Sequence, residues 1–212
     1  MISIENKKIL VMAPHTDDME FGCGGTIHKL IQQGNDVYCA TFSACLQSVL
    51  KDFPSDILIT ESKNASNIIG LKKENLLLYN FDVRTFNYHR QAILEQMILL
   101  RHEINPDIIF SPSLKDIHQD HAVIAEETLR AFKNKTIFNY EVIWNNLSFQ
   151  TTCFFELSEE NISTKIAAVK SYQSQAHRPY ANDEFMRSLA RTRGLQIGTQ
   201  YAECFEILRI NF

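Results

Sequence analysis

The sequence has little of what marks a secreted, disulfide-linked or membrane-spanning protein. Its five cysteines, among 212 residues, are widely spaced and include no Cys-x-x-Cys pair, which argues against a disulfide framework and against a zinc ribbon. No hydrophobic run approaches the ~18 apolar residues of a membrane span, and the N-terminal run over residues 9–14 stops at His15. We therefore expect a soluble, cytoplasmic protein with reduced thiols and no membrane span.

The sequence also has no excess of positive charge. Its 21 Lys and Arg against 25 Asp and Glu give a formal net charge of −4, so general binding to nucleic acid is not expected. The seven glycines and five prolines form no linker, and no repeat interrupts the chain. We expect one globular domain over residues 1–212, with the oligomeric state left open and a homo-oligomer included.

Short apolar runs alternate with amphipathic segments over the first two thirds of the chain. Buried strands are predicted at residues 7–13, 36–42, 75–79 and 107–111, and helices at residues 22–33, 56–70, 88–104 and 119–132. This alternation predicts an α/β fold with a mostly parallel sheet and helices on both faces. The last third is mixed, with strands predicted at 136–143, 151–157 and 201–210 and helices at 159–173 and 182–193.

Two polar clusters, residues 14–20 and 116–121, directly follow the first and fourth predicted strands. Ligands bind at the carboxyl ends of strands in such folds, so we expect the two clusters to meet. His15, Asp18 and His121 could supply two imidazoles and a carboxylate to a catalytic zinc site that keeps one position open. Iron, cobalt or nickel would also suit these ligands. Asp17 would remain free to take a proton from water, and Asp120 could orient a neighbouring imidazole.

Structural interpretations of the first cluster stay open at this point. Asp17 or Asp18 could cap the helix that is predicted from Gly22, as short acidic residues often do. The stretch over residues 22–26 (GCGGT) could cradle a phosphate at a helix N-terminus, although it lacks the third glycine of a dinucleotide fingerprint. Its glycines could instead permit a tight turn and close helix packing beside the site. The presence of two clusters favours the metal site.

The two clusters carry a resemblance to a known family. Residues 13–26 (APHTDDMEFGCGGT), paired with residues 118–121 (HQDH), resemble the zinc-dependent N-deacetylases of the LmbE/PIG-L family, whose pattern is H-P-D-D-E, then G-C-G-G-T, then H-P-D-H. The resemblance implies a Rossmann-like α/β fold and hydrolysis of an acetamido group, usually on an N-acetylated amino sugar or sugar conjugate. It makes His15, Asp18 and His121 the zinc ligands and Asp17 the general base. It makes His118 the group that stabilises the oxyanion and protonates the leaving amine, with Asp120 orienting His118.

The sequence departs from the family pattern at four positions. Thr16 and Gln119 replace prolines, which changes loop stiffness and removes no ligand. Met19 replaces the glutamate after the two aspartates, and Glu20 stands beside it, so a supporting role of that glutamate is in question. Leu58 stands where many members have an arginine that contacts substrate, so substrate recognition must differ from those members.

Substrate contacts are less constrained by the sequence. Arginine can bind a phosphate or carboxylate, and the candidates are Arg84, Arg178, Arg191 and Arg193, each of which could equally lie on a solvated face. Trp144 could stack on a sugar ring and Asn145 could donate hydrogen bonds to it, although Trp144 could also be a core residue. His177 could line the pocket.

Three alternatives to an N-acetyl amino-sugar deacetylase follow from the same residues. The same chemistry could act on an N-formyl group or on a non-sugar amide. A non-catalytic sugar- or nucleotide-binding module would bind no metal tightly and would tolerate changes at Asp17. A nucleotide-dependent oxidoreductase or methyltransferase would need a fuller glycine fingerprint and an acidic residue after the second strand, and the residues 43–46 that follow it provide none.

Overall fold

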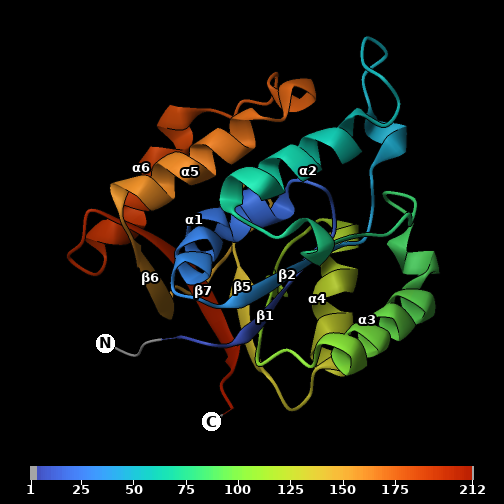
Figure 1. Cartoon of the computed structure of the whole chain (residues 1–212), viewed down its shortest axis with the longest axis horizontal. Helices are drawn as coiled ribbons and strands as arrows, with labels where there is room; N and C mark the ends of the chain where they lie inside the picture. Colours follow the sequence, from blue (N-terminus) through green and yellow to red (C-terminus); the bar gives the residue numbers. More distant parts are fainter. Residues whose placement is uncertain (1–3, 212) are drawn as a thin grey trace.

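One seven-stranded sheet organises the chain, in a computed structural model that describes residues 4–211 (Figure 1). The sheet has the order β3-β2-β1-β4-β5-β7-β6. Its strands are β1 (Lys8–Ala13), β2 (Asp36–Thr41), β3 (Leu76–Leu78), β4 (Ile108–Pro112), β5 (Thr136–Tyr140), β6 (Cys153–Leu157) and β7 (Tyr201–Arg209). The pairs among β1 to β5 are parallel, and β7 runs antiparallel to both β5 and β6. The mostly parallel α/β fold predicted from the sequence is confirmed.

Within residues 4–211, six α-helices cover the two faces of the sheet (Figure 1). Helices α1 (Asp18–Gln32), α2 (Ile57–Ile69), α5 (Glu159–Lys170) and α6 (Asp183–Leu195) lie on one side, and α3 (Arg90–Ile104) and α4 (Gln119–Ala131) lie on the other. Alternate residues of β1 pack into two hydrophobic cores, one on each face of the sheet, because side chains along a strand point to opposite faces. Ile9 and Val11 pack in the core under α1 and α2, whereas Leu10 and Met12 pack in the core under α3 and α4.

The predicted elements are all present, with differences mostly at their ends. The largest difference is in α1, which begins at Asp18, four residues before the predicted start at Gly22. Its N-cap residue is Asp17, whose side chain makes no capping hydrogen bond, and Asp18 Oδ2 instead accepts a hydrogen bond from the His15 amide at 2.7 Å. Neither Asp17 nor Asp18 therefore caps this helix with its side chain, and the interpretation of these two residues as helix caps is wrong.

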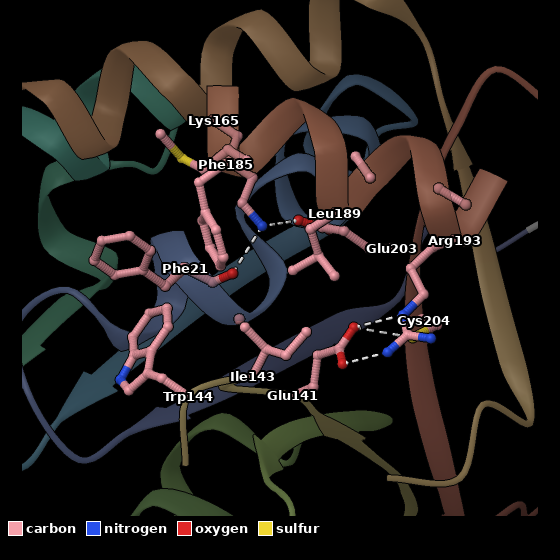
Figure 2. Close-up of a pocket in the computed structure, with 14 residues that line it drawn as sticks. Phe21, Glu141, Ile143, Trp144, Lys165, Phe185, Leu189, Arg193, Glu203 and Cys204 are labelled. Carbon is pink, nitrogen blue, oxygen red and sulfur yellow. Dashed lines mark hydrogen bonds and ion pairs between the residues drawn. The ribbon is translucent and has the colours of Figure 1, made fainter. Parts of the chain in front are cut away.

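Helix α1 breaks at Cys23, whose φ of −149° and ψ of 16° are not helical. A buried ion pair between Lys165 and Glu203 forms hydrogen bonds with the backbone groups around this break (Figure 2). Lys165 Nζ donates to the Phe21 carbonyl at 2.7 Å and to Glu203 Oε1 at 2.6 Å, and the Glu203 carboxylate accepts from the amides of Gly25 and Thr26. Because Glu203 occupies these amides, they are not available to a phosphate, and that interpretation of the glycine stretch is wrong.

The glycines of this stretch instead allow close packing, which was the second interpretation. A Cβ atom at Gly22 would lie 2.3 Å from Cδ2 of Tyr140, and one at Gly25 would lie 2.6 Å from Cδ1 of Leu157. Both distances are shorter than real carbon contacts, so a side chain at either position would force the Tyr140 ring or the Leu157 side chain to move. Within the described residues, no helix is long and apolar enough to cross a membrane.

Candidate metal centre and its pocket

The two polar clusters meet at the point where the strand order reverses. The chain goes from β1 outward to β2 and β3, and then returns to the other side of β1 as β4, which pairs with β1 directly. The segments that follow β1 and β4 therefore start side by side, which is where open α/β sheets bind ligands. His15 lies in the first segment, Asp18 begins α1, and His121 lies in the first turn of α4.

Three donor atoms from these segments form a small triangle. His15 Nδ1 lies 3.2 Å from Asp18 Oδ2 and 3.2 Å from His121 Nε2, and His121 Nε2 lies 3.3 Å from Asp18 Oδ2. Ligands about 2.0–2.1 Å from a tetrahedral zinc ion lie about 3.3 Å from one another, by simple trigonometry. The spacing and the chemistry of this donor triangle (His15, Asp18, His121) therefore fit a zinc ion, although 106 positions separate the two histidines.

Each histidine of the donor triangle is held by a carboxylate on its other ring nitrogen. His121 Nδ1 lies 2.7 Å from Asp116 Oδ2, and His15 Nε2 lies 3.0 Å from Asp120 Oδ2. Such carboxylate–histidine contacts set the tautomer and the orientation of a metal-binding ring. Asp116 and Asp120 are both buried, which strengthens these contacts.

The position of Asp120 corrects one expectation. The resemblance implied that Asp120 orients His118, but its carboxylate holds His15 and accepts from the amides of Arg84 and Phe86. The reason is local: His118 is the N-cap of α4, and its Nδ1 accepts the Asp120 amide at 3.2 Å. The Asp120 side chain is thereby directed away from His118 and toward the loop after β1.

His118 and Asp17 lie beside the donor triangle and line the same pocket. The His118 ring centroid is 4.9 Å from that of His15 and 4.8 Å from that of His121. The three histidines can each offer a nitrogen within 4.8 Å of the others, so His118 is close to any bound cation. With Nδ1 accepting from the Asp120 amide, the neutral His118 ring carries its proton on Nε2.

The charges of the site favour a cation at the donor triangle. Burial opposes ionisation of Asp18, but His121 and His15 outweigh it and hold the pKa of that carboxyl well below its usual range. Burial also lowers the pKa of His121, yet Asp18 and Asp116 raise it to about 10. Positive charge is therefore stabilised between these two carboxylates.

The two neighbouring groups behave differently from the donor triangle. Burial and the adjacent Asp18 raise the pKa of Asp17 to about 6, against the opposing charges of His15 and Arg178. Burial, together with His121 and His15, lowers the pKa of His118 to about 4, so this ring is neutral at pH 7. The site thus places a carboxylate of raised proton affinity and a neutral hydrogen-bond donor beside the donor triangle.

The donor triangle opens into a pocket of about 670 Å³. Four of the candidate substrate contacts line it: Arg84, Trp144, Asn145 and Arg178. Trp144 is 37% exposed and stacks on Tyr180 with ring centroids 3.7 Å apart, and Phe21 meets both rings edge-on. The pocket therefore has an aromatic wall (Phe21, Trp144, Tyr180) beside the donor triangle, and Trp144 is not a core residue.

The other candidate substrate contacts lie outside this pocket. Arg193 is bound to the Glu141 carboxylate through two nitrogens, and Arg191 donates to the Gln200 carbonyl, so neither lines this pocket. His177 is exposed and does not line it either. Arg178 and Tyr180, which follow it closely in the chain, do line the pocket.

Asp116 and Tyr180 are among the residues of the site that were not assigned a role from the sequence. Asp116 belongs to the second polar cluster, and its position five residues before His121 indicates that its carboxylate could reach that ring. An antiparallel bridge between Asp116 and Asn146 and a hydrogen bond from the Ile117 amide to the Asn145 carbonyl fix its loop. Tyr180 gave no signal, because its stacking on Trp144 joins two loops that lie far apart in the chain.

Comparison with known proteins identifies the family of this chain. Residues 10–132, which include both polar clusters, match the sequence profile of the PIG-L family, described as GlcNAc-PI de-N-acetylase. The chain belongs to the PIG-L family. The matched region ends at the close of α4 and so contains the whole donor triangle. Family membership establishes the chain as a deacetylase-family protein and confirms the resemblance seen in the sequence.

Two sequence relatives are named as deacetylases. The chain is 27% identical over 184 residues to the uncharacterized deacetylase YaiS of Escherichia coli, covering 82% of this chain and 96% of that protein. It is 27% identical over 220 residues to the diacetylchitobiose deacetylase of Thermococcus kodakarensis, covering 93% of this chain and 81% of that protein.

Solved structures share the fold. The N,N'-diacetylchitobiose deacetylase of Pyrococcus horikoshii superimposes with a TM-score of 0.80 at 21% identity, over 95% of this chain and 84% of that one. The 4-carboxy-2-hydroxymuconate hydratase GalB of Pseudomonas putida superimposes with a TM-score of 0.75 at 18% identity, over 97% and 98%. At these identities the likeness shows the fold alone, and the residues of the site must decide the reaction.

Proposed function

We propose that this protein hydrolyses the N-acetyl group of an amino sugar or sugar conjugate, with a zinc ion bound by the donor triangle. The observation that carries the proposal is the triangle itself, three donors 3.2–3.3 Å apart, each from a segment at the carboxyl end of a strand. The family match and the relatives named as deacetylases support the reaction class. When bound, zinc lowers the pKa of water toward 7 and polarises a carbonyl oxygen.

Asp17 is the proposed general base. Its carboxylate lines the pocket next to the donor triangle and takes no part in capping α1. Its raised proton affinity suits it to take a proton from the attacking water and to hold it through the addition step. Water then forms the new C–O bond to the acetamido carbon, the C–N bond breaks, and acetate and a free amine leave.

His118 is the proposed partner of the carbonyl oxygen. Because the Asp120 amide fixes its Nδ1, its Nε2–H can donate a hydrogen bond to the oxyanion, and the departing amine takes the proton that Asp17 removed from water rather than one from the neutral His118 ring. Asp120 and Asp116 act through the histidines they hold, His15 and His121. They are positioning residues in this proposal.

Metal analysis followed by a substrate panel tests the proposal. The purified protein is expected to contain about one zinc, or another divalent transition metal, per chain. It is expected to release acetate from N-acetylglucosamine or diacetylchitobiose, to lose this activity with a chelator, and to regain it with added zinc. Formate release from N-formylglucosamine, or hydrolysis of a non-sugar acetamide alone, would favour the other amidohydrolase readings. Tight sugar binding with no metal and no hydrolysis would contradict the proposal and indicate a binding module.

A further inference from the structure

The backbone carbonyl of Thr16 accepts hydrogen bonds from two side chains that come from distant parts of the chain. Thr16 lies between the ligand His15 and the proposed base Asp17. Its carbonyl accepts a hydrogen bond from the Tyr172 hydroxyl and a longer one, at 3.4 Å, from Ser62 Oγ. All three residues of this contact are buried, so water does not compete for the carbonyl and its pairing depends on the two hydroxyls.

The loop that carries Thr16 has no proline ring to stiffen it at this position. Thr16 stands where the family pattern has a proline, whose ring would fix the backbone angle φ at about −65°. A threonine leaves that angle free to rotate. The conformation of this loop therefore depends more strongly on the hydrogen bonds that its backbone groups form with the rest of the protein.

Tyr172 is itself held in place by α2, the helix that carries Ser62. Two residues after Tyr172, Ser174 donates its amide at 2.9 Å and also its hydroxyl to the carboxylate of Glu61, which precedes Ser62 in α2. Glu61 and Ser174 are both buried. Because these contacts fix the backbone beside Tyr172, the hydroxyl can be removed without displacing the ring.

The peptide group between Thr16 and Asp17 transmits this contact to the proposed base. A peptide group is planar and trans, so its carbonyl and its N–H point in opposite directions. With the Thr16 carbonyl held in the interior, the Asp17 amide is fixed on the other edge of the plane, where it donates to the carboxylate of its own residue. In the described part of the chain no other residue donates a hydrogen bond to that carboxylate, whereas Asp18, Asp116 and Asp120 each accept the amide of another residue.

We propose that Tyr172 is a positioning residue for Asp17, and that its hydroxyl holds the Thr16–Asp17 peptide so that the Asp17 carboxylate faces the attacking water. This inference rests on the proposed function, in which Asp17 takes a proton from that water. It gives the hydroxyl no contact with substrate and no part in metal binding. Since a misplacement of about 1 Å can cost about 10²-fold in rate, loss of the hydroxyl acts on kcat.

Two buried tyrosines provide a matched pair of variants to test the inference. Tyr140, like Tyr172, is buried and donates its hydroxyl to a backbone carbonyl, that of Met12 in β1, at 2.9 Å. Tyr172→Phe and Tyr140→Phe each remove one buried hydrogen bond, and each should lower Tm by roughly 2–6 °C. Only Tyr172→Phe should also lower kcat for acetate release, by about 10- to 100-fold, with KM within about twofold of the wild-type value.

Two further measurements separate an effect on Asp17 from an effect on the metal ligands. A competition titration with a chromophoric chelator should give Tyr172→Phe a zinc affinity within about twofold of the wild type, because all three donors remain. In metal-free protein, amide hydrogen exchange of residues 14–20 should be faster in Tyr172→Phe than in the wild type or in Tyr140→Phe. Ser62→Ala removes the longer hydrogen bond and should lower kcat by at most about threefold.

Turnover of the wild type separates failure of this inference from failure of the proposed function. If the wild type releases acetate and Tyr172→Phe turns over as fast as Tyr140→Phe, or exchange of residues 14–20 is unchanged, the inference is wrong and the proposed function stands. A zinc affinity that falls as far as kcat would place the effect at His15 and would also overturn the inference. No acetate from any substrate in zinc-loaded wild-type protein would overturn the proposed function, and this inference with it.

Discussion

Phe21 and Trp144 separate two groups of charged side chains that look alike in composition and differ in arrangement. On one side is the donor triangle. On the other is a group that we call the paired cluster (Lys165, Glu203, Arg193 and Glu141), which surrounds a cavity of about 20 Å³ (Figure 2). Both groups combine carboxylates with basic side chains near α1, so composition does not tell which one binds a ligand.

The arrangement of partners does distinguish them. In the paired cluster each cation meets its own carboxylate, Lys165 with Glu203 at 2.6 Å and Arg193 with Glu141 at 2.7 Å. In the donor triangle three lone-pair donors lie within 3.3 Å of one another around one point, and the carboxylates behind the histidines direct them there. The ion pairs of the paired cluster stabilise the fold, whereas the converging donor atoms of the triangle have the arrangement of a cation site. The following experiments test that distinction.

The largest effect is expected from removing a donor of the triangle. His121→Ala should leave the protein folded but without tightly bound metal, and turnover should fall to the background rate because two donors do not hold a catalytic ion. Metal content and acetate release measure this directly. His177→Ala, at an exposed histidine outside the pocket, is the matched control and should keep both. Normal metal content in His121→Ala would show that the triangle is not the metal site.

The next largest effect is expected at Asp17. Asp17→Asn keeps the size of the side chain and the donor triangle but removes the proton acceptor, so kcat should fall by about 10²–10⁴-fold, the usual contribution of a general base. Metal content should stay at the wild-type level. Near-normal turnover with bound metal would show that another group accepts the proton.

In the paired cluster we expect a loss of stability with no loss of metal. Glu203→Gln leaves Lys165 buried without its carboxylate, which should cost about 3–5 kcal/mol in the free energy of unfolding. For a domain of this size that corresponds to a fall in Tm of roughly 6–20 °C. Glu126→Gln, at an exposed acid that pairs with Arg90, should change Tm little because water screens that pair. If Glu203→Gln kept its Tm but lost metal, the distinction between the two clusters would fail.

The smallest effect is expected from the carboxylate behind a ligand. Asp116→Asn keeps a hydrogen-bond acceptor near His121 Nδ1 but removes the charge, so zinc affinity should fall by about 10–100-fold while saturating zinc restores most of the turnover. A competition titration with a chromophoric chelator gives the affinity. Unchanged affinity would mean that the loop alone orients His121.

The local sequence was sufficient to predict most of the fold. Short apolar runs such as residues 7–13 and 107–111 are typical of buried strands, and the helices between them favour right-handed parallel crossovers. That order alone brings His15 and His121 to one end of the sheet, so the donor triangle could be anticipated from spacing. The early start of α1 at Asp18 could not be anticipated from the sequence. The short helical segment before the break at Cys23 depends on contacts with Lys165 and Glu203, which come from distant parts of the chain.

The sequence by itself determined that the two polar clusters meet at one end of the sheet, and only the tertiary structure decided which other residues reach the site and which side chains are partners there. Asp120 holds His15 and not His118, Asp116 holds His121, and Arg193 is bound to Glu141 while Arg178 is left for the pocket. Strand order follows from patterns of a few neighbouring residues. A hydrogen bond or an ion pair instead depends on positions known to a few tenths of an ångström, between groups that only the packed fold brings together.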